Sequence, residues 1–146
     1  MKTVVVNQKN RVQEWVADRI GGNPAWESFE AIGLEKDGEL IAGVIIDGYV
    51  ENTRCSIHCA GEGKQWLNRE FLFVVFDYVF RQLNCNVVVQ TVCSNNVDSM
   101  KFTSHLGFGE KCRIEDGALG GDLVILSMRR EDCRWIKPRM KNEPKE

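Results

Sequence analysis

A buried helix followed by a buried strand constrains the fold of this chain more than any other sequence feature. Residues 65–83 predict a helix that is apolar over most of its circumference, and such helices are normally covered on several sides. Residues 86–93 follow, with three valines in succession, which is typical of a strand buried on both faces in parallel pairing. Together with a strand predicted at residues 53–60, they form one β-α-β crossover, which we expect to be right-handed.

The segments before the crossover predict an antiparallel sheet. Residues 11–20 carry apolar side chains at helical spacing, which predicts an amphipathic helix before the sheet. Strands are expected at residues 29–34 and 40–49, joined by a turn at Asp37-Gly38, a pair typical of β-hairpins. Residues 53–60 then serve both as the third strand of this meander and as the first strand of the crossover.

A short helix and a hairpin are expected to complete the domain. Residues 97–106 predict the helix, closed by Gly107-Phe108, and residues 109–115 and 122–129 predict two strands separated by a glycine-rich turn. Residues 137–146 are charged and nearly free of apolar side chains, so we expect a disordered tail there. The prediction is one α/β (α+β) domain over residues 1–136, with a mixed, mostly antiparallel sheet and one parallel crossover.

Size and charge exclude several classes of protein. The 146 residues suffice for one domain. A formal net charge of -2 and a pI near 5.8 argue against a nucleic-acid-binding protein. No stretch approaches the roughly 18 apolar residues that cross a membrane, and the apolar run at the N-terminus is too short for a signal peptide. The expected location is therefore the cytoplasm.

The six cysteines do not predict a metal site. They show no repeated C-x-x-C spacing, and without a secretion signal reduced thiols are expected. In a strand over residues 53–60, Cys55, Ile57 and Cys59 point to one face and His58 points to the other. The histidine therefore cannot join both thiols on one metal ion. We interpret the cysteines as small buried hydrophobes.

The order of these elements is similar to that of the GNAT superfamily of acyltransferases, and the segment at residues 95–108 carries the resemblance most specifically. In that family a strand ends at an asparagine, a short helix follows, and Leu-Gly-Phe closes it. Asn96 and Ser99 fall where the family places N-x-x-[S/A]. The resemblance covers residues 11–136. Residues 128–135 also look like the close of many short phage and bacterial members, which points to a phage origin.

The resemblance implies an N-acetyltransferase that uses acetyl-CoA and acts on a protein N-terminus, a lysine or a small amine. A homodimer paired through C-terminal strands and a monomer both remain open. The competing hypothesis is a catalytically weak or inert protein of the same fold that binds CoA or a protein partner. A zinc-bound regulatory domain is a minor third alternative.

The expected cofactor site lies beyond the carboxyl ends of the two parallel strands, where open α/β sheets bind ligands. The buried helix is predicted to start near Gln65 or Trp66, so that its first N–H groups face a pyrophosphate. Lys64 and Arg69 would add positive charge. The expected cofactor-binding residues are Ile57, Cys59, Gly61, Gly63, Lys64, Gln65, Trp66, Leu67, Asn68, Arg69, Asn96, Ser99 and Phe102.

This loop departs from the family pattern [Q/R]-x-x-G-x-[G/A]. The sequence here is Gly61-Glu-Gly-Lys-Gln-Trp-Leu-Asn68, so that the glycines come early and bulky residues follow where small ones belong. Gly-x-Gly alone also fits an ordinary strand-to-helix turn. The departure bears on cofactor affinity more than on the fold.

Acyl transfer to an amine needs a carbonyl polariser, a proton acceptor and a proton donor. By resemblance, a backbone N–H within residues 57–60 would polarise the thioester carbonyl. The resembling proteins often carry a Glu or His as proton acceptor on that same strand, so the resemblance makes His58 the leading base, and imidazole titrates in the right range. A hydrogen-bonded sheet histidine is the alternative, and both interpretations stay open. Glu35 and Glu62 are weaker candidates.

The proton donor is the second departure from the family. Many members place a tyrosine where this chain has Thr103, and a threonine hydroxyl is a far poorer donor. Water, Ser99 or Ser104 would then supply the proton, or catalysis is weak. By resemblance Asn96 would bind the pantetheine arm, and it is also suited to cap the following helix. Trp26 and Phe29 are expected to line an acceptor pocket.

Overall fold

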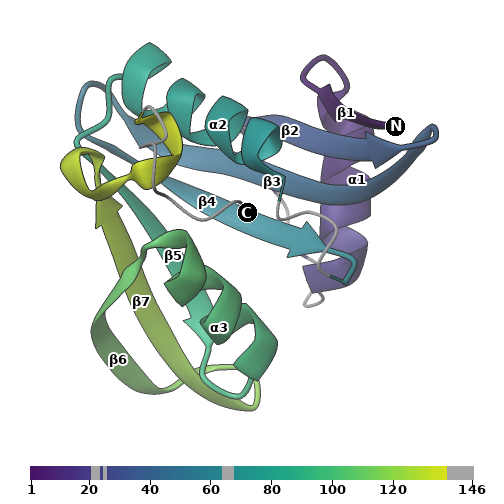
Figure 1. The fold of residues 1–146 in the computed structure, drawn as a ribbon. Coiled ribbons are helices and arrows are strands. Elements are labelled where there is room, and N and C mark those ends of the chain that lie inside the picture. Colours follow the sequence, from purple (N-terminus) through teal and green to yellow (C-terminus); the bar gives the residue numbers. More distant parts are fainter. Residues whose placement is uncertain (21–23, 25, 64–67, 138–146) are drawn as a thin grey trace.

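Among the residues that the computed structural model describes, one mixed sheet of seven strands forms the middle of the molecule (Figure 1). The structure describes residues 1–20, 24, 26–63 and 68–137. The strands lie side by side in the order β1-β2-β3-β4-β5-β7-β6. They are β1 (Lys2–Val5), β2 (Phe29–Lys36), β3 (Glu39–Val50), β4 (Arg54–Gly61), β5 (Val87–Cys93), β6 (Gly109–Ala118) and β7 (Gly121–Arg129).

The parallel pair of this sheet is β4 and β5. All other neighbouring strands that the structure describes run antiparallel. The chain passes from β4 to β5 through α2 (Arg69–Asp77) and η1 (Tyr78–Gln82), which confirms the predicted β-α-β unit. The mixed, mostly antiparallel α/β sheet expected from the sequence is therefore confirmed.

The edge strand β1 is one element that the sequence pattern does not reveal. It has four residues, and it pairs with β2 through Val4 opposite Leu34 and Val5 opposite Gly33. A strand of four residues is too short for the alternation of apolar and polar side chains to be recognised in the sequence. The hairpin between β2 and β3 confirms its turn signal, because Asp37 and Gly38 have φ values of 54° and 87°. Positive φ at both central residues is what a two-residue hairpin of the common type requires.

Helix α1 (Lys9–Ile20) covers one face of the sheet and packs unusually close to it. Its Val12 and Val16 are fully buried against β2 and β3. A Cβ at Gly43 would lie 2.6 Å from a methyl of Val16, and one at Gly33 would lie 3.0 Å from a methyl of Val12. The two glycines therefore permit the close approach of α1, which brings that helix near β4 as well.

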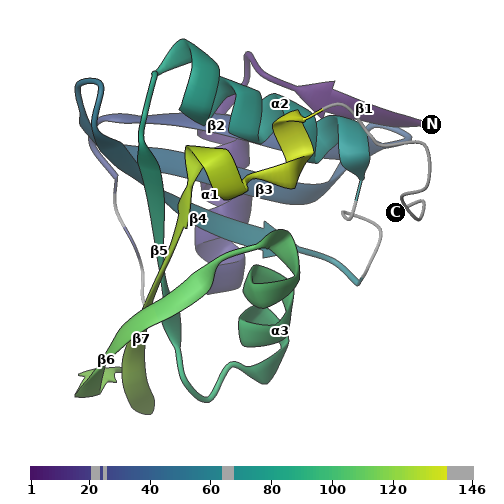
Figure 2. The same cartoon turned by 60° about the vertical axis from the view of Figure 1, so that its left-hand side comes forward.

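The opposite face carries the main core, under α2 and α3 (Val97–Leu106) (Figures 1 and 2). Phe71 and Phe76 of α2 and Leu106 of α3 pack with residues of β2, β3, β4, β5 and β7 in this core. Two short 3₁₀ helices follow β7 in the described part of the chain, η2 (Arg130–Asp132) and η3 (Arg134–Ile136). Trp135 of η3 is 1% exposed and donates a hydrogen bond from Nε1 to the carbonyl oxygen of Leu106 at 2.8 Å.

The crossover helix begins later than predicted. Asn68 has extended backbone angles and accepts a hydrogen bond from the N–H of Phe71 at 2.9 Å, so it is the N-cap and α2 starts at Arg69. The predicted start near Gln65 or Trp66 is therefore wrong, and residues 64–67 lie outside the described residues. From Tyr78 the helix changes to a π-turn, with the N–H of Leu83 bonded to the carbonyl of Tyr78 at 2.8 Å.

The predicted C-terminal tail lies outside the described residues, apart from Lys137. Among the helices that the structure describes, none combines the length and the apolar character needed to cross a lipid bilayer.

Candidate active site

The two parallel strands separate soon after they begin. β4 and β5 pair only from Arg54 opposite Val87 to Ser56 opposite Val89, although both strands continue. Residues 57–61 of β4 are bonded to β3 alone among the described strands, and the rest of β5 is bonded to β7. Figures 1 and 2 show the two parts of the sheet diverging at this point. The inner edge of β4 therefore presents backbone N–H and C=O groups that none of the described strands uses.

Two helices begin just beyond the carboxyl ends of these strands. α2 follows β4 and is capped by Asn68, and α3 follows β5 and is capped by Asn96, whose side-chain oxygen accepts from the N–H of Ser99 at 3.1 Å. Helix N-termini carry partial positive charge and attract anions. The cap role considered for Asn96 is confirmed, and Asn68 has the same role in α2.

The predicted pyrophosphate loop is described only at its two ends. Gly61 is the last residue of β4, and Gly63 has φ of +61° with open space where a Cβ would lie. Residues 64–67, which include four of the expected cofactor contacts, lie outside the described residues. Arg69 opens α2, and its guanidinium lies 5.7 Å from the ring centre of Trp135. This places a cation beside the N-terminus of α2.

His58 lies on the α1 face of β4, opposite the main core. Its Nε2 is 2.8 Å from Oδ1 of Asp47 on β3, and the two side chains are 28% and 26% exposed. The imidazole lies 5.2 Å from the ring of Trp26, centre to centre. Trp26 and Phe29, the expected acceptor-pocket residues, pack beside the small core under α1. The hydrogen-bonded sheet histidine considered from the sequence is therefore present, and it is also half-exposed.

The pairing with Asp47 selects one tautomer of neutral His58. A carboxylate only accepts hydrogen bonds, so Nε2 carries the hydrogen that is donated to Asp47. The other nitrogen, Nδ1, then holds the lone pair. In this tautomer the hydrogen-bond acceptor of the imidazole is Nδ1, which is not the nitrogen that faces Asp47.

The two glutamates considered as weaker bases are both engaged in ion pairs. Glu35 lies on β2, separated from β4 by β3, and binds Arg11 of α1. Glu62 follows β4 and accepts from Nη2 of Arg19 at 2.8 Å. The structure thus does not place Glu35 beside His58.

Several expected cofactor residues share the face of the sheet opposite His58. Ile57 is buried in the main core, and Cys59 and Phe102 pack against it. Burial raises the pKa of the Cys59 thiol to about 12, so this thiol is neutral near pH 7. Ser99 is half-buried in the first turn of α3. No group of three or more His, Cys, Asp or Glu side chains in the described part of the chain is arranged to hold a metal ion.

The structure adds Gln90 to the candidate residues and gives Thr103 a clearer position. Both are buried, and Gln90 Oε1 and Thr103 Oγ1 have no hydrogen-bond partner among the described residues. Ser104, the neighbouring candidate donor, is exposed. A sequence signal for Gln90 does exist: it is a polar residue inside the apolar run 87–92, in phase with the inward-pointing Val88 and Val92.

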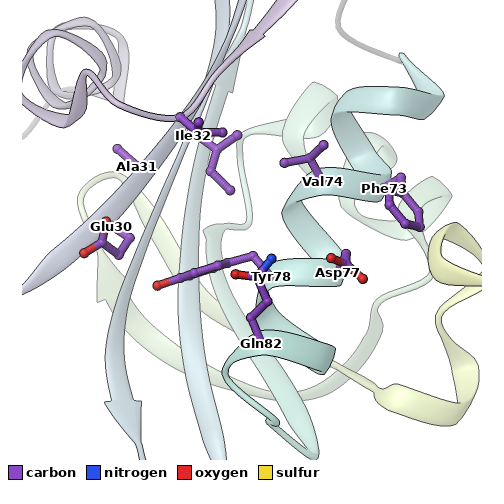
Figure 3. A pocket seen from close by; sticks show the side chains of 9 residues that line it. Glu30, Ala31, Ile32, Phe73, Val74, Asp77, Tyr78 and Gln82 are labelled. Atoms are coloured by element: carbon purple, nitrogen blue, oxygen red, sulfur yellow. The ribbon is translucent and has the colours of Figure 1, made fainter.

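Two hollows in the described part of the molecule lie away from the strand divergence. One, of about 340 Å³, lies between β2 and the α2–η1 helix (Figure 3). The Tyr78 ring extends across it toward Glu30, and burial, followed by the charge of Glu30, raises the pKa of Tyr78. The other, of about 430 Å³, lies between α1 and the β2–β3 turn. Neither contains a residue of β4, β5 or α3.

Comparison with solved structures identifies the fold. No protein-family model and no curated protein sequence matches the chain. A spermidine N-acetyltransferase variant, SpeG from Vibrio cholerae, is 11% identical, with a TM-score of 0.71 over 93% of this chain and 96% of its own. The structure of yncA from Salmonella typhimurium, described as an acetyltransferase and solved with its cofactor acetyl-CoA, is 14% identical, with a TM-score of 0.67 over 88% of this chain and 93% of its own. The chain therefore has the GNAT fold of these acetyltransferase structures.

Proposed function

We propose that this protein is an N-acetyltransferase that transfers the acetyl group of acetyl-CoA to an amine. The observation that carries the proposal is the divergence of β4 and β5, which leaves an open strand edge with helix N-termini beyond the carboxyl ends of both strands. An open edge suits a ligand with several amides, and helix N-termini suit its phosphates. The solved neighbour that contains acetyl-CoA supports the same assignment of the donor.

In this proposal the donor lies along the edge of β4 at residues 57–60. One backbone N–H there would donate to the thioester carbonyl and stabilise the negative charge that develops on its oxygen. The N-terminus of α2 and the nearby Arg69 would bind the pyrophosphate. Asn96 and Ser99, at the start of α3, would lie beside the pantetheine arm.

The acceptor amine would approach from the α1 face, where His58 lies. His58 would take the ammonium proton at Nδ1, directly or through water, while Asp47 holds Nε2. The freed nitrogen would then attack the thioester carbon, the C–S bond would break, and the departing sulfur would take a proton. Donor and acceptor would thus meet from opposite faces of the sheet. Trp26 would form part of the acceptor site.

Thr103 favours a second candidate, a protein of the same fold that binds CoA with little or no catalysis. It occupies the position where many GNAT proteins carry a tyrosine that donates the proton, and a threonine hydroxyl is a poor acid. Water would have to protonate the sulfur in an active enzyme. We rank this candidate below the transferase because His58 and Asp47 form a suitable base.

A binding and turnover experiment tests the proposal. Acetyl-CoA at about 100 times its dissociation constant should raise stability by about 2.7 kcal/mol, which is a shift of several degrees in the melting temperature. ATP is the control ligand. Release of free thiol in the presence of an amine panel then separates the two candidates, because a binding protein would show the shift without turnover. No shift at millimolar acetyl-CoA would contradict both.

A further inference from the structure

A hollow lies at the outer edge of the sheet, where β1 stops short of the end of β2. β1 pairs with β2 only from Lys2 opposite Lys36 to Val5 opposite Gly33, so residues 29–32 of β2 have no described strand on that side. The α2–η1 helix lies across from this end of β2, and the space between them measures about 340 Å³ (Figure 3). Because a cavity of about 150 Å³ can hold a benzene ring, this hollow is large enough for a bicyclic ring.

The walls of the hollow are mostly apolar. The apolar lining side chains come from the residue after β1, from β2 and from α2; they are Val6, Ala31, Ile32, Phe73 and Val74. Two of them are well exposed for apolar residues, Val6 at 53% and Phe73 at 40%. Apolar walls with a few polar groups are typical of sites for small organic molecules. The walls therefore favour a ligand with an apolar body.

The charged groups of the hollow are carboxylates. Glu30 of β2 and Asp77 of α2 line it, and no Lys or Arg does so in the part of the chain that the structure describes. Asp77 is paired with Arg81, with Nη1 of the arginine 3.3 Å from Oδ1. Glu30 has no such ion-pair partner among the described residues. The charge that remains unbalanced in the hollow is therefore the negative charge of Glu30.

Tyr78 brings an aromatic ring and a hydroxyl close to this charge. Its ring extends across the hollow toward Glu30 (Figure 3). Burial, followed by the charge of Glu30, raises the pKa of Tyr78, so that its hydroxyl stays protonated near pH 7. Tyr78 and Gln82, which also lines the hollow, are the first and last residues of the π-turn η1, and π-turns are frequent at functional sites. A cation is attracted both to a carboxylate and to the face of an aromatic ring.

We propose that the hollow between β2 and the α2–η1 helix binds a small organic ammonium ion with an apolar body. The ammonium group lies between Glu30 and Tyr78, and the body packs against Ile32 and Val74. An anionic ligand does not match, because the lining described here carries carboxylates and no basic side chain. The inference goes beyond the proposed function and does not depend on it, since the hollow contains no residue of β4, β5 or α3 and lies on the face of the sheet opposite His58.

Chemical-shift titration of ¹⁵N-labelled protein with three indole probes tests the inference. Tryptamine is a cation, tryptophol is neutral and indole-3-propionate is an anion, and all three carry the same ring on a two-carbon chain. Tryptamine should bind, with shifts gathered at residues 6, 30–32 and 73–82. Tryptophol should bind about three- to tenfold more weakly, because it lacks the charge, and indole-3-propionate more weakly still.

Substitutions at the two polar groups sharpen the test. Glu30→Gln should raise the dissociation constant of tryptamine about three- to tenfold and leave that of tryptophol unchanged. Glu30→Lys should reverse the preference, so that indole-3-propionate binds more tightly than tryptamine; a merely structural role of Glu30 would not produce this reversal. Tyr78→Phe, which keeps the ring, should weaken tryptamine about two- to fivefold. Glu115→Gln and Tyr49→Phe repeat the same changes at exposed positions on β6 and β3 and should change nothing.

Four results would overturn the inference. They are equal affinities of the wild type for tryptamine and tryptophol, an unchanged affinity of Glu30→Gln for tryptamine, shifts at β4 around His58 with none at β2, and no shift at about 10 mM tryptamine. The third would assign the probe to the proposed acceptor site. If the fourth came with self-association that Glu30→Lys abolishes, the occupant would be a second copy of the chain. Failure of acetyl-CoA to bind would contradict the proposed function alone.

Discussion

Replacing Asp47 by Asn should slow acetyl transfer through its effect on His58. The hydrogen bond between Asp47 and His58 is 2.8 Å long, but both side chains are more than a quarter exposed, so solvent screens it. A charged hydrogen bond contributes about 1.5–3 kcal/mol when well buried, and we take about 1 kcal/mol here. Loss of that stabilisation from the imidazolium that forms during the reaction corresponds to about a fivefold lower kcat.

The assay is thiol release from acetyl-CoA at saturating amine, measured for four proteins: wild type, Asp47→Asn, His58→Ala and the double variant. His58→Ala should lose about a hundredfold or more. The Asp47 substitution should have no further effect in the His58→Ala background, because its role passes through the imidazole. An equal fivefold loss in both backgrounds would refute the reasoning. Asp77→Asn, a 24% exposed carboxylate paired with Arg81 at 3.3 Å, is the matched control and should keep full activity.

Two further predictions concern packing and burial. Gly43→Ala should lower the free energy of unfolding by about 1–3 kcal/mol, because its Cβ would lie 2.6 Å from a methyl group of Val16. In urea unfolding, the double variant with Val16→Ala should lose less stability than the sum of the two single variants. Strict additivity would show that α1 does not pack this closely. Burial raises the pKa of the Cys59 thiol from an ordinary 9.0 to about 12, so the stability that the neutral thiol contributes below pH 9 should be lost as pH rises toward 12. Between pH 8 and 10 the free energy of unfolding of Cys59→Ala should fall by up to about 1 kcal/mol less than that of the wild type. Equal losses would mean that the thiol is not buried.

The sequence predicts the fold where its patterns are long. The β-α-β unit follows from an apolar helix and a β-branched run, and α3 is found with its predicted bounds because Asn96 and Gly107 mark both ends. β1 is missed because four residues at a sheet edge carry no usable period. The start of α2 is misplaced because the apolar pattern does not reveal that Asn68 is an extended cap.

The candidate site is less predictable than the fold, because its geometry depends on contacts between distant residues. His58 is a candidate base from the sequence because the resembling family often carries a Glu or His on this strand, but its partner Asp47 is eleven residues away on a neighbouring strand and no local motif connects them. Gln90 is visible in the sequence as a polar residue among valines, but the sequence does not show whether its side chain has a hydrogen-bond partner. The extent of β4–β5 pairing, on which the proposed site depends, is not encoded in any local pattern.

Amide hydrogen exchange with and without acetyl-CoA tests the central claim, that the donor lies in the β4–β5 divergence. With acetyl-CoA we expect new protection at residues 57–61 of β4 and in the first turns of α2 and α3, and with ATP we expect none. Unchanged exchange at β4, or protection confined to the hollow between β2 and η1, would contradict it.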